Sequence, residues 1–222
     1  MPDQPAPAIS RSLFVFAILY GGMTCLAGVL GNKQIALGPL AVEAGIVAFL
    51  LLVILSSAVA ETHGRETASK LVLYGFLPLI VSMALIRLVL ALPAAAVMEP
   101  ARLAAFDIIL GQSARLMLAG LIAYGISQTL NVTIFSALRR NERRMLWLRA
   151  GVASMLSQIV DTLLFITIAF YGVFPIGNLL LGQMIAKVVL SAVMVPPLTY
   201  LFVGLARRLD AQPAIAPAAR EG

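Results

Sequence analysis

Long apolar runs, separated by short polar connections, dominate this chain. A helix needs roughly 20 mostly apolar residues to cross the hydrocarbon core of a bilayer, and runs of about this length occur six times. The expected spans are residues 13–30, 40–60, 71–97, 116–138, 146–171 and 176–205. The runs are continuous, whereas strands of a transmembrane barrel alternate apolar and polar residues over about ten positions. The pattern therefore predicts an all-α integral membrane protein, a bundle of six transmembrane helices.

The composition agrees with this interpretation and limits what the rest of the chain can be. Hydrophobic residues make up 61% of the sequence, charged residues only 12%, and the mean hydropathy is +0.98. We therefore expect residues 13–205 to form a single transmembrane domain, without a second, soluble one. Residues 1–12 and 206–222 contain several prolines and alanines and lack the apolar surface that would order them. We expect them to be flexible tails.

The basic residues gather in alternate connections between the spans. They are Arg11 before the first span, Arg65 and Lys70 after the second, Arg139, Arg140, Arg143, Arg144 and Arg149 after the fourth, and Arg207, Arg208 and Arg220 after the sixth. Because Lys and Arg favour the cytoplasmic side of a membrane, both termini are expected to be cytoplasmic. The same arrangement predicts contacts of the basic clusters with the headgroups of the lipid bilayer, and no nucleic-acid partner.

Two ionisable residues, Asp161 and Lys187, each lie near the middle of an expected span. An ionisable side chain is costly there unless it is paired or faces water, so these residues are the first candidates for function. Both belong to polar stripes at helical spacing, which are Tyr124, Ser127, Gln128 and Asn131 in the fourth span, Ser154, Ser157, Gln158 and Asp161 in the fifth, and Gln183, Lys187 and Ser191 in the sixth. The first two stripes repeat at an offset of 30 residues, as in Ser127-Gln128 and Ser157-Gln158, and antiparallel helices would let them face each other.

A water-accessible cavity inside the bundle explains these stripes, because an unsatisfied polar group facing lipid costs several kcal/mol. Serine, glutamine and asparagine also join transmembrane helices through hydrogen bonds worth about 1 kcal/mol. Asp161 and Lys187 are likewise compatible with a purely structural ion pair. The sequence leaves both interpretations open, and it leaves the roles of Glu43 and Arg87 undecided.

Three motifs carry a resemblance to a known family. Residues 61–68 read E-x2-G-x3-A, residues 115–135 read R-x8-Y-x3-Q-x2-N-x3-F, and residues 154–170 read S-x6-D-T-x2-F-x3-A-F. Together with Lys187 in the last span, they make residues 32–205 similar to the queuosine-precursor transporter family, also called the vitamin uptake transporter family. The family usually has aspartate where this chain has Ser57 and Asn131, a difference that changes the charge of the expected cavity.

The resemblance implies a six-helix importer in the bacterial inner membrane for a 7-deazaguanine precursor of queuosine, either the 7-cyano or the 7-aminomethyl compound. Such a base has a guanidine-like donor edge, which the Asp161 carboxylate could accept through two parallel hydrogen bonds. The candidates that could donate to its carbonyl edge are Gln128, Asn131, Gln158 and Lys187, and those that could stack on the ring are Tyr124 and Phe165. The candidates for coupling or gating are Glu61, Arg87 and Arg115. No cofactor or metal is expected.

Other functions compete with this prediction. The chain has no Gly-x4-Gly-Lys-Ser/Thr phosphate loop and so is not itself an ATPase. A substrate-binding subunit for a separate energising module, and an importer of another purine or vitamin, both stay open. An enzyme is not expected, because the single histidine, His63, cannot form a two-histidine zinc site and is not expected to reach a serine nucleophile. Small residues on the first span are compatible with a homodimer; they are Gly21, Gly22, Gly28 and Gly31.

Overall fold

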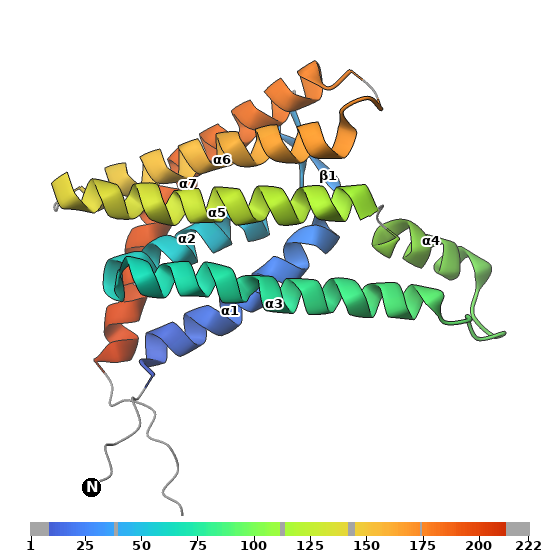
Figure 1. Ribbon diagram of the computed structural model, residues 1–222, viewed down its shortest axis with the longest axis horizontal. Helices are drawn as coiled ribbons and strands as arrows, with labels where there is room; N and C mark the ends of the chain where they lie inside the picture. Colours follow the sequence, from blue (N-terminus) through green and yellow to red (C-terminus); the bar gives the residue numbers. More distant parts are fainter. Residues whose placement is uncertain (1–8, 38–39, 112–113, 142–144, 174, 212–222) are drawn as a thin grey trace, which may run out of the picture.

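The computed structural model describes residues 9–37, 40–111, 114–141, 145–173 and 175–211. Within these ranges the chain forms seven helices and one β-hairpin (Figure 1). In chain order the elements are α1 (Arg11–Leu30), β1 (Gln34–Leu37), β2 (Leu40–Glu43), α2 (Ile46–Thr62), α3 (Gly64–Ala91), α4 (Pro100–Leu110), α5 (Ala114–Asn141), α6 (Leu146–Phe170) and α7 (Gly177–Asp210).

Five helices, α1, α3, α5, α6 and α7, are long and apolar enough to cross a membrane. The apolar helix α2 is shorter, with 17 residues that extend about 25 Å at 1.5 Å per residue. Most of α2 is buried against its neighbours. The second expected span is therefore a central helix, enclosed by the five longer ones.

A β-hairpin replaces the first residues of that expected span, so the prediction of a purely helical chain with a span starting at residue 40 is wrong there. β1 and β2 pair antiparallel, with Gln34 opposite Glu43. Gly45 is the N-cap of α2 and lies close to α1. A Cβ atom at Gly45 would lie 2.6 Å from the carbonyl oxygen of Ala27 in α1, so the chain can approach α1 this closely only without a side chain.

The connection between α2 and α3 is a sharp turn at His63 and Gly64. Gly64 has a φ of +87°, a conformation that favours glycine, and it lets α3 reverse direction directly after α2. α3 ends at Ala91 and not at the expected residue 97, and the exposed helix α4, which the apolar pattern did not predict, follows it. Pro100 suits the first turn of α4, because proline lacks an N–H that would be unbonded there anyway.

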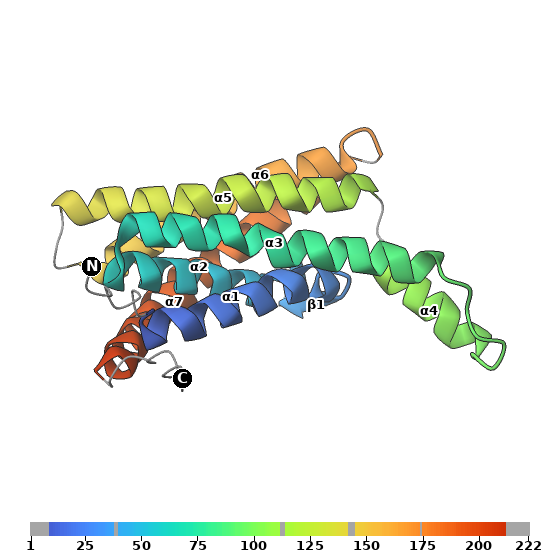
Figure 2. The same ribbon diagram turned by 60° about the horizontal axis from the view of Figure 1, so that its bottom comes forward.

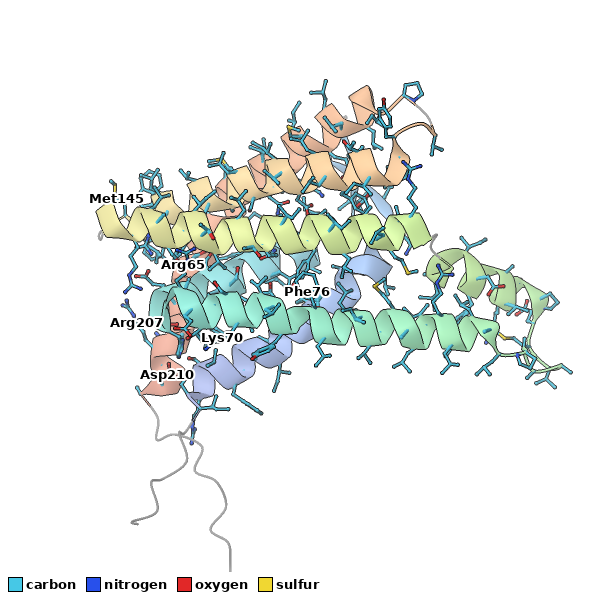
Figure 3. The ribbon with its side chains drawn as sticks, viewed as in Figure 1. Arg65, Lys70, Phe76, Met145, Arg207 and Asp210 are labelled. Atoms are coloured by element: carbon cyan, nitrogen blue, oxygen red, sulfur yellow. The ribbon has the colours of Figure 1, made fainter. Side chains whose placement is uncertain are left out.

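The two described ends of the chain meet at one end of the bundle, and the β-hairpin and α4 lie at the other (Figures 1 and 2). The Ser12 backbone N–H and hydroxyl donate to the two carboxylate oxygens of Asp210, over 3.0 and 2.7 Å. Arg65, Lys70 and Arg207 lie at this same end (Figure 3). α7 continues to Asp210, five residues past its expected end at 205. The tails expected at 1–12 and 206–222 lie mostly outside the described residues.

The outer faces of the long helices are apolar, as lipid contact requires. Large apolar side chains are exposed along α3 and α7, among them Leu73, Leu77 and Leu201. The buried core lies instead around α2, where residues such as Leu52 and Ile54 pack inside the ring of longer helices. A surface this apolar over several helices marks a protein that is embedded in a membrane.

Candidate functional site

A cavity of about 390 Å³ lies within the bundle, a volume typical of a small-molecule pocket. Its walls come from α1, α2, α3, α5, α6, α7, the hairpin and the end of α4. The lining includes the hairpin and residues at helix ends such as Gly31, Leu110, Leu116 and Phe170. These ends lie away from the start of α1 and the end of α7 (Figure 1). The cavity therefore reaches from the middle of the bundle toward the hairpin end.

Asp161 from α6 and Lys187 from α7 both line this cavity and form an ion pair, with 3.2 Å between Asp161 Oδ2 and Lys187 Nζ. The Ser127 hydroxyl on α5 donates to the other carboxylate oxygen, Oδ1, over 3.2 Å. This bond confirms that the polar stripes of the fourth and fifth spans face each other. Both charged side chains are almost completely buried, which leaves the cavity as their route to a ligand.

Glu43 adds a second carboxylate to the same cavity, and sequence reasoning left its role undecided. Its Oε1 accepts a hydrogen bond from Gln183 Nε2 over 3.4 Å, one helical turn from Lys187 on α7. Glu43 belongs to the hairpin, outside the helical spans, and burial raises the pKa of its carboxyl although Lys187 acts to lower it. A carboxylate at the start of an apolar run was the available signal, but the expected helix there concealed its position.

Aromatic rings form part of the cavity wall. Tyr124 on α5 donates a hydrogen bond to the Tyr20 hydroxyl over 2.9 Å and packs edge-to-face on Phe76, with 4.9 Å between ring centroids. Phe49 lines the cavity from α2, and its ring centroid lies 6.0 Å from Lys187 Nζ. Phe165 lines it from α6. The two predicted stacking residues, Tyr124 and Phe165, are thus both on the wall.

Gln128 and Asn131 lie deeper than the cavity, toward the start of α1 and the end of α7, and the described lining does not include them. Asn131 Nδ2 donates to Ser56 and Ser57 on α2, over 3.1 and 3.2 Å. The Ser56 hydroxyl in turn lies 3.4 Å from Gln128 Oε1. Ser57 and Asn131 therefore contact each other directly, as a neutral pair.

Gln158 is also buried outside the lining of the cavity. Neither its side-chain oxygen nor its nitrogen has a hydrogen-bond partner among the described residues, and the same holds for Gln128 Nε2 and Asn131 Oδ1. Buried amides are almost always hydrogen-bonded, so unpaired ones at this depth are unusual. Three of the predicted ligand residues thus form a polar layer beneath the cavity, separate from Asp161, Lys187 and Tyr124.

The candidates for coupling or gating are dispersed. Glu61 on α2 forms an ion pair with Arg149 on α6, whose guanidinium is fully buried and lies 4.5 Å from the centroid of the Phe135 ring. Arg115 donates from Nε and Nη2 to the carbonyl oxygens of Ile168 and Tyr171, over 2.6 Å each, at the end of α6. Glu61 therefore joins α2 to the start of α6, and Arg115 joins the start of α5 to the end of α6 at the opposite end of the bundle.

The third candidate, Arg87, is exposed on α3 and is not part of the described cavity lining. Arg149, in contrast, is buried although it was expected at the surface. Sequence reasoning counted it among the residues that meet lipid headgroups, but it is buried inside the bundle. Its position at the start of a helix made a surface location plausible, and only the packing of α2 against α6 shows its partner.

His63 reaches two serines, contrary to expectation. Its Nε2 lies 2.7 Å from Ser10 Oγ, 3.3 Å from Ser12 Oγ and 3.4 Å from Asp210 Oδ2. In a serine-nucleophile triad the serine and the carboxylate contact opposite nitrogens of the imidazole. Here the serines and the carboxylate share one nitrogen, so the cluster joins the ends of α1, α2 and α7 and does not have the geometry of a triad.

Apolar helices around a buried cavity with a charged pair and aromatic walls are the architecture of a small-molecule transporter of the membrane. The family model described as "Putative vitamin uptake transporter" matches residues 43–202, and the chain belongs to this family. A curated relative, the "Probable queuosine precursor transporter" of Bacillus subtilis (strain 168), is 29% identical over 185 residues, which cover 79% of this chain and 78% of that protein. No solved structure matches the chain. The chain is a multi-pass cell membrane protein.

Proposed function

We propose that this protein imports a small planar nucleobase, specifically a 7-deazaguanine precursor of queuosine. The observation that carries the proposal is the buried Asp161–Lys187 pair at the edge of an aromatic-walled cavity. A deazaguanine carries a donor edge beside a ring carbonyl. The carboxylate can accept from the donor edge while the ammonium donates to the carbonyl, so the substrate would insert between these two groups, which otherwise contact each other.

The aromatic walls suit the flat ring of such a substrate. Tyr124 is held by Tyr20 and Phe76, and this support would fix the orientation of its ring before the substrate arrives. Phe165 would cover the ring from α6. Stacking on a fixed aromatic side chain contributes about 1–3 kcal/mol for a nucleobase. Charge and shape would therefore act together on the same molecule.

The transport route follows from the proposed topology, with six spans that include α2 and with both termini cytoplasmic. In that orientation the cavity faces the outside, and the polar layer of Gln128, Asn131 and Gln158 lies between the substrate and the cytoplasm. The unpaired amide groups of this layer would bind the base as it moves inward. The buried Glu61–Arg149 pair would close the cytoplasmic end until α2 and α6 separate.

Rescue of queuosine tests the import function. A bacterium that cannot make the precursor, and that lacks its own importer, would be supplied with limiting 7-cyano- or 7-aminomethyl-7-deazaguanine. We expect expression of this protein to restore queuosine in tRNA with at least one of them. Absence of queuosine with both compounds, despite correct insertion, would contradict the proposal.

Uptake by the purified protein in lipid vesicles separates the alternatives. Saturable accumulation by this chain alone supports a self-sufficient importer. Binding without uptake indicates a substrate-binding subunit that needs an energising module. Competition by other purines or vitamins, but not by deazaguanines, indicates a different substrate.

A further inference from the structure

We propose that Glu43 makes this site prefer a planar substrate that carries a primary ammonium group over an otherwise identical neutral one. The inference rests on the proposed import of a 7-deazaguanine. The two candidate substrates differ in the required way, since the 7-aminomethyl compound is a cation at neutral pH and the 7-cyano compound is neutral. Glu43 would thus decide between them.

The first argument is the charge of the cavity. Its charged lining residues in the described part of the chain are Glu43, Asp161 and Lys187, two carboxylates and one ammonium. Asp161 is already balanced by Lys187, and its other oxygen accepts from Ser127. Glu43 receives a hydrogen bond only from the neutral amide of Gln183, over 3.4 Å, as far as the described residues show. The charge of Lys187 also acts on Glu43, so one ammonium serves two carboxylates. A cationic ligand would supply a second positive charge.

The second argument is the position of Glu43 in the fold. It lies on β2 in the hairpin, toward the opening of the cavity, whereas Asp161 lies near the middle of α6. A base whose donor edge reaches Asp161 would direct its far side, which carries the 7-substituent, toward the hairpin. Gln34 lies opposite Glu43 on β1 and also lines the cavity, so it could accept a further hydrogen bond from an ammonium group.

The third argument is the depth of Glu43 in the bundle. Ser57 and Asn131 are bonded to each other below the cavity and carry no charge. Glu43 instead places a carboxylate in the hairpin, at the other end of the cavity. The cost of burying it without a cation is consistent with the raised pKa of its carboxyl, which an ammonium ligand would lower again.

The test compares the affinities of the two compounds for the purified full-length protein by calorimetry. We expect the wild type to bind 7-aminomethyl-7-deazaguanine at least about 10-fold more tightly than the 7-cyano compound, the size of a charge-assisted hydrogen bond. Glu43→Gln keeps the shape of the side chain and its contact with Gln183 but removes the charge. It should bring the ratio close to one by weakening the aminomethyl compound alone.

Glu99→Gln is the matched control, because Glu99 is exposed and pairs with Arg102 at the start of α4, outside the described cavity lining. It should keep the wild-type ratio. A wild type that prefers the cyano compound, or a Glu43→Gln protein that keeps the aminomethyl preference, overturns the inference. If the Glu43→Gln protein does not fold, the ratio of the two affinities of the wild type alone decides whether the inference stands. Binding of neither compound by the wild type would instead refute the proposed import function.

Discussion

At the scale of single residues, the site depends on whether each buried charge has a partner. Asp161 and Lys187 form a direct ion pair, whereas Glu43 is hydrogen-bonded by a neutral amide and shares the charge of Lys187 with Asp161. A buried pair contributes little net stability, but the loss of one partner leaves an uncompensated charge. Substitutions at these positions should therefore act on ligand binding and on folding together, and the experiments must separate the two.

Asp161→Asn should abolish uptake of the deazaguanine, because an amide can accept only one of the two donor hydrogens and leaves Lys187 without its partner. Removing one member of a buried pair costs about 3–5 kcal/mol, so the melting temperature should fall as well. Asp161→Asn combined with Lys187→Met removes both charges and should recover part of that stability without uptake. Wild-type transport by Asp161→Asn would refute the assigned role. Vesicle uptake and thermal unfolding measure the two effects.

Glu43 makes ligand binding depend on pH. Burial raises the pKa of its carboxyl, so the group becomes neutral on acidification at a higher pH than an ordinary glutamate. Affinity for the 7-aminomethyl compound should therefore fall as the pH decreases through that pKa. The groups that face Glu43 are Gln34, Gln183, Lys187 and Asp161. The 7-cyano compound is the control for titration of Asp161, and an equal loss of both compounds would contradict a specific role of Glu43.

At the scale of elements, glycines set the distances between α1, α3 and α5. A Cβ atom at Gly75 on α3 would lie 2.5 Å from Tyr20 Cε1 and 2.8 Å from the Tyr124 hydroxyl oxygen. Gly125 on α5 similarly allows close contact with Phe76, whose side chain lies between α3 and α5 (Figure 3). The helices can approach closely enough to hold Tyr124 in place only because these residues lack side chains.

Gly75→Ala should displace the Tyr20–Tyr124 pair and so weaken substrate binding. Overpacking of this kind typically costs about 1–3 kcal/mol. Gly22→Ala is the control, since a Cβ atom at Gly22 meets no described atom within 4 Å. Thermal unfolding and ligand affinity should change for Gly75→Ala and stay near wild type for Gly22→Ala. Equal behaviour of the two variants would show that the contact does not constrain Tyr124.

The Glu61–Arg149 pair joins α2 to α6 at the end of the bundle where Ser12 contacts Asp210. Arg149→Met replaces the guanidinium with an apolar side chain of similar length and leaves Glu61 without its cation. We expect the free energy of unfolding to fall by about 3–5 kcal/mol. Arg207→Met, at an exposed position on α7, is the control and should change stability little. The melting temperatures of the purified proteins test this. A melting temperature of Arg149→Met equal to that of the control would indicate that the pair is not essential for packing.

At the scale of the whole molecule, the question is which side of the membrane the cavity faces. Both described chain ends lie opposite the hairpin end of the cavity (Figures 1 and 2). If the basic end is cytoplasmic, the cavity faces the outside and the polar layer lies between it and the cytoplasm. Inward movement of the substrate then requires the helices around that layer to rearrange.

Cys25, the single cysteine of the chain, can report this orientation because it lines the cavity and is only partly buried. A membrane-impermeant thiol reagent should modify it from outside intact cells. Bound deazaguanine should slow the reaction several-fold. The Cys25→Ser protein measures the background labelling, and inverted membrane vesicles expose the cytoplasmic face to the same reagent. Modification only from the cytoplasmic face would contradict the proposed topology.

The sequence by itself determined the apolar helices, the polar stripes on α5 and α6, and the place of Asp161 and Lys187 inside the bundle. These predictions succeed because the need for a helix in lipid is local: every apolar run must satisfy its own backbone, and every polar residue within a run must find water or a partner. A motif of a few residues at helical spacing was therefore enough to locate a buried ion pair beside the cavity.

Only the tertiary structure decided which polar residues share the cavity. It places Glu43 from a hairpin beside Lys187, puts Gln128, Asn131 and Gln158 in a layer beneath, and buries Arg149 against Glu61. Those positions depend on how far each helix is rotated and how deeply it lies against its neighbours. Helix rotation is set by contacts between residues far apart in the chain, such as Gly45 against Ala27, which no local pattern encodes.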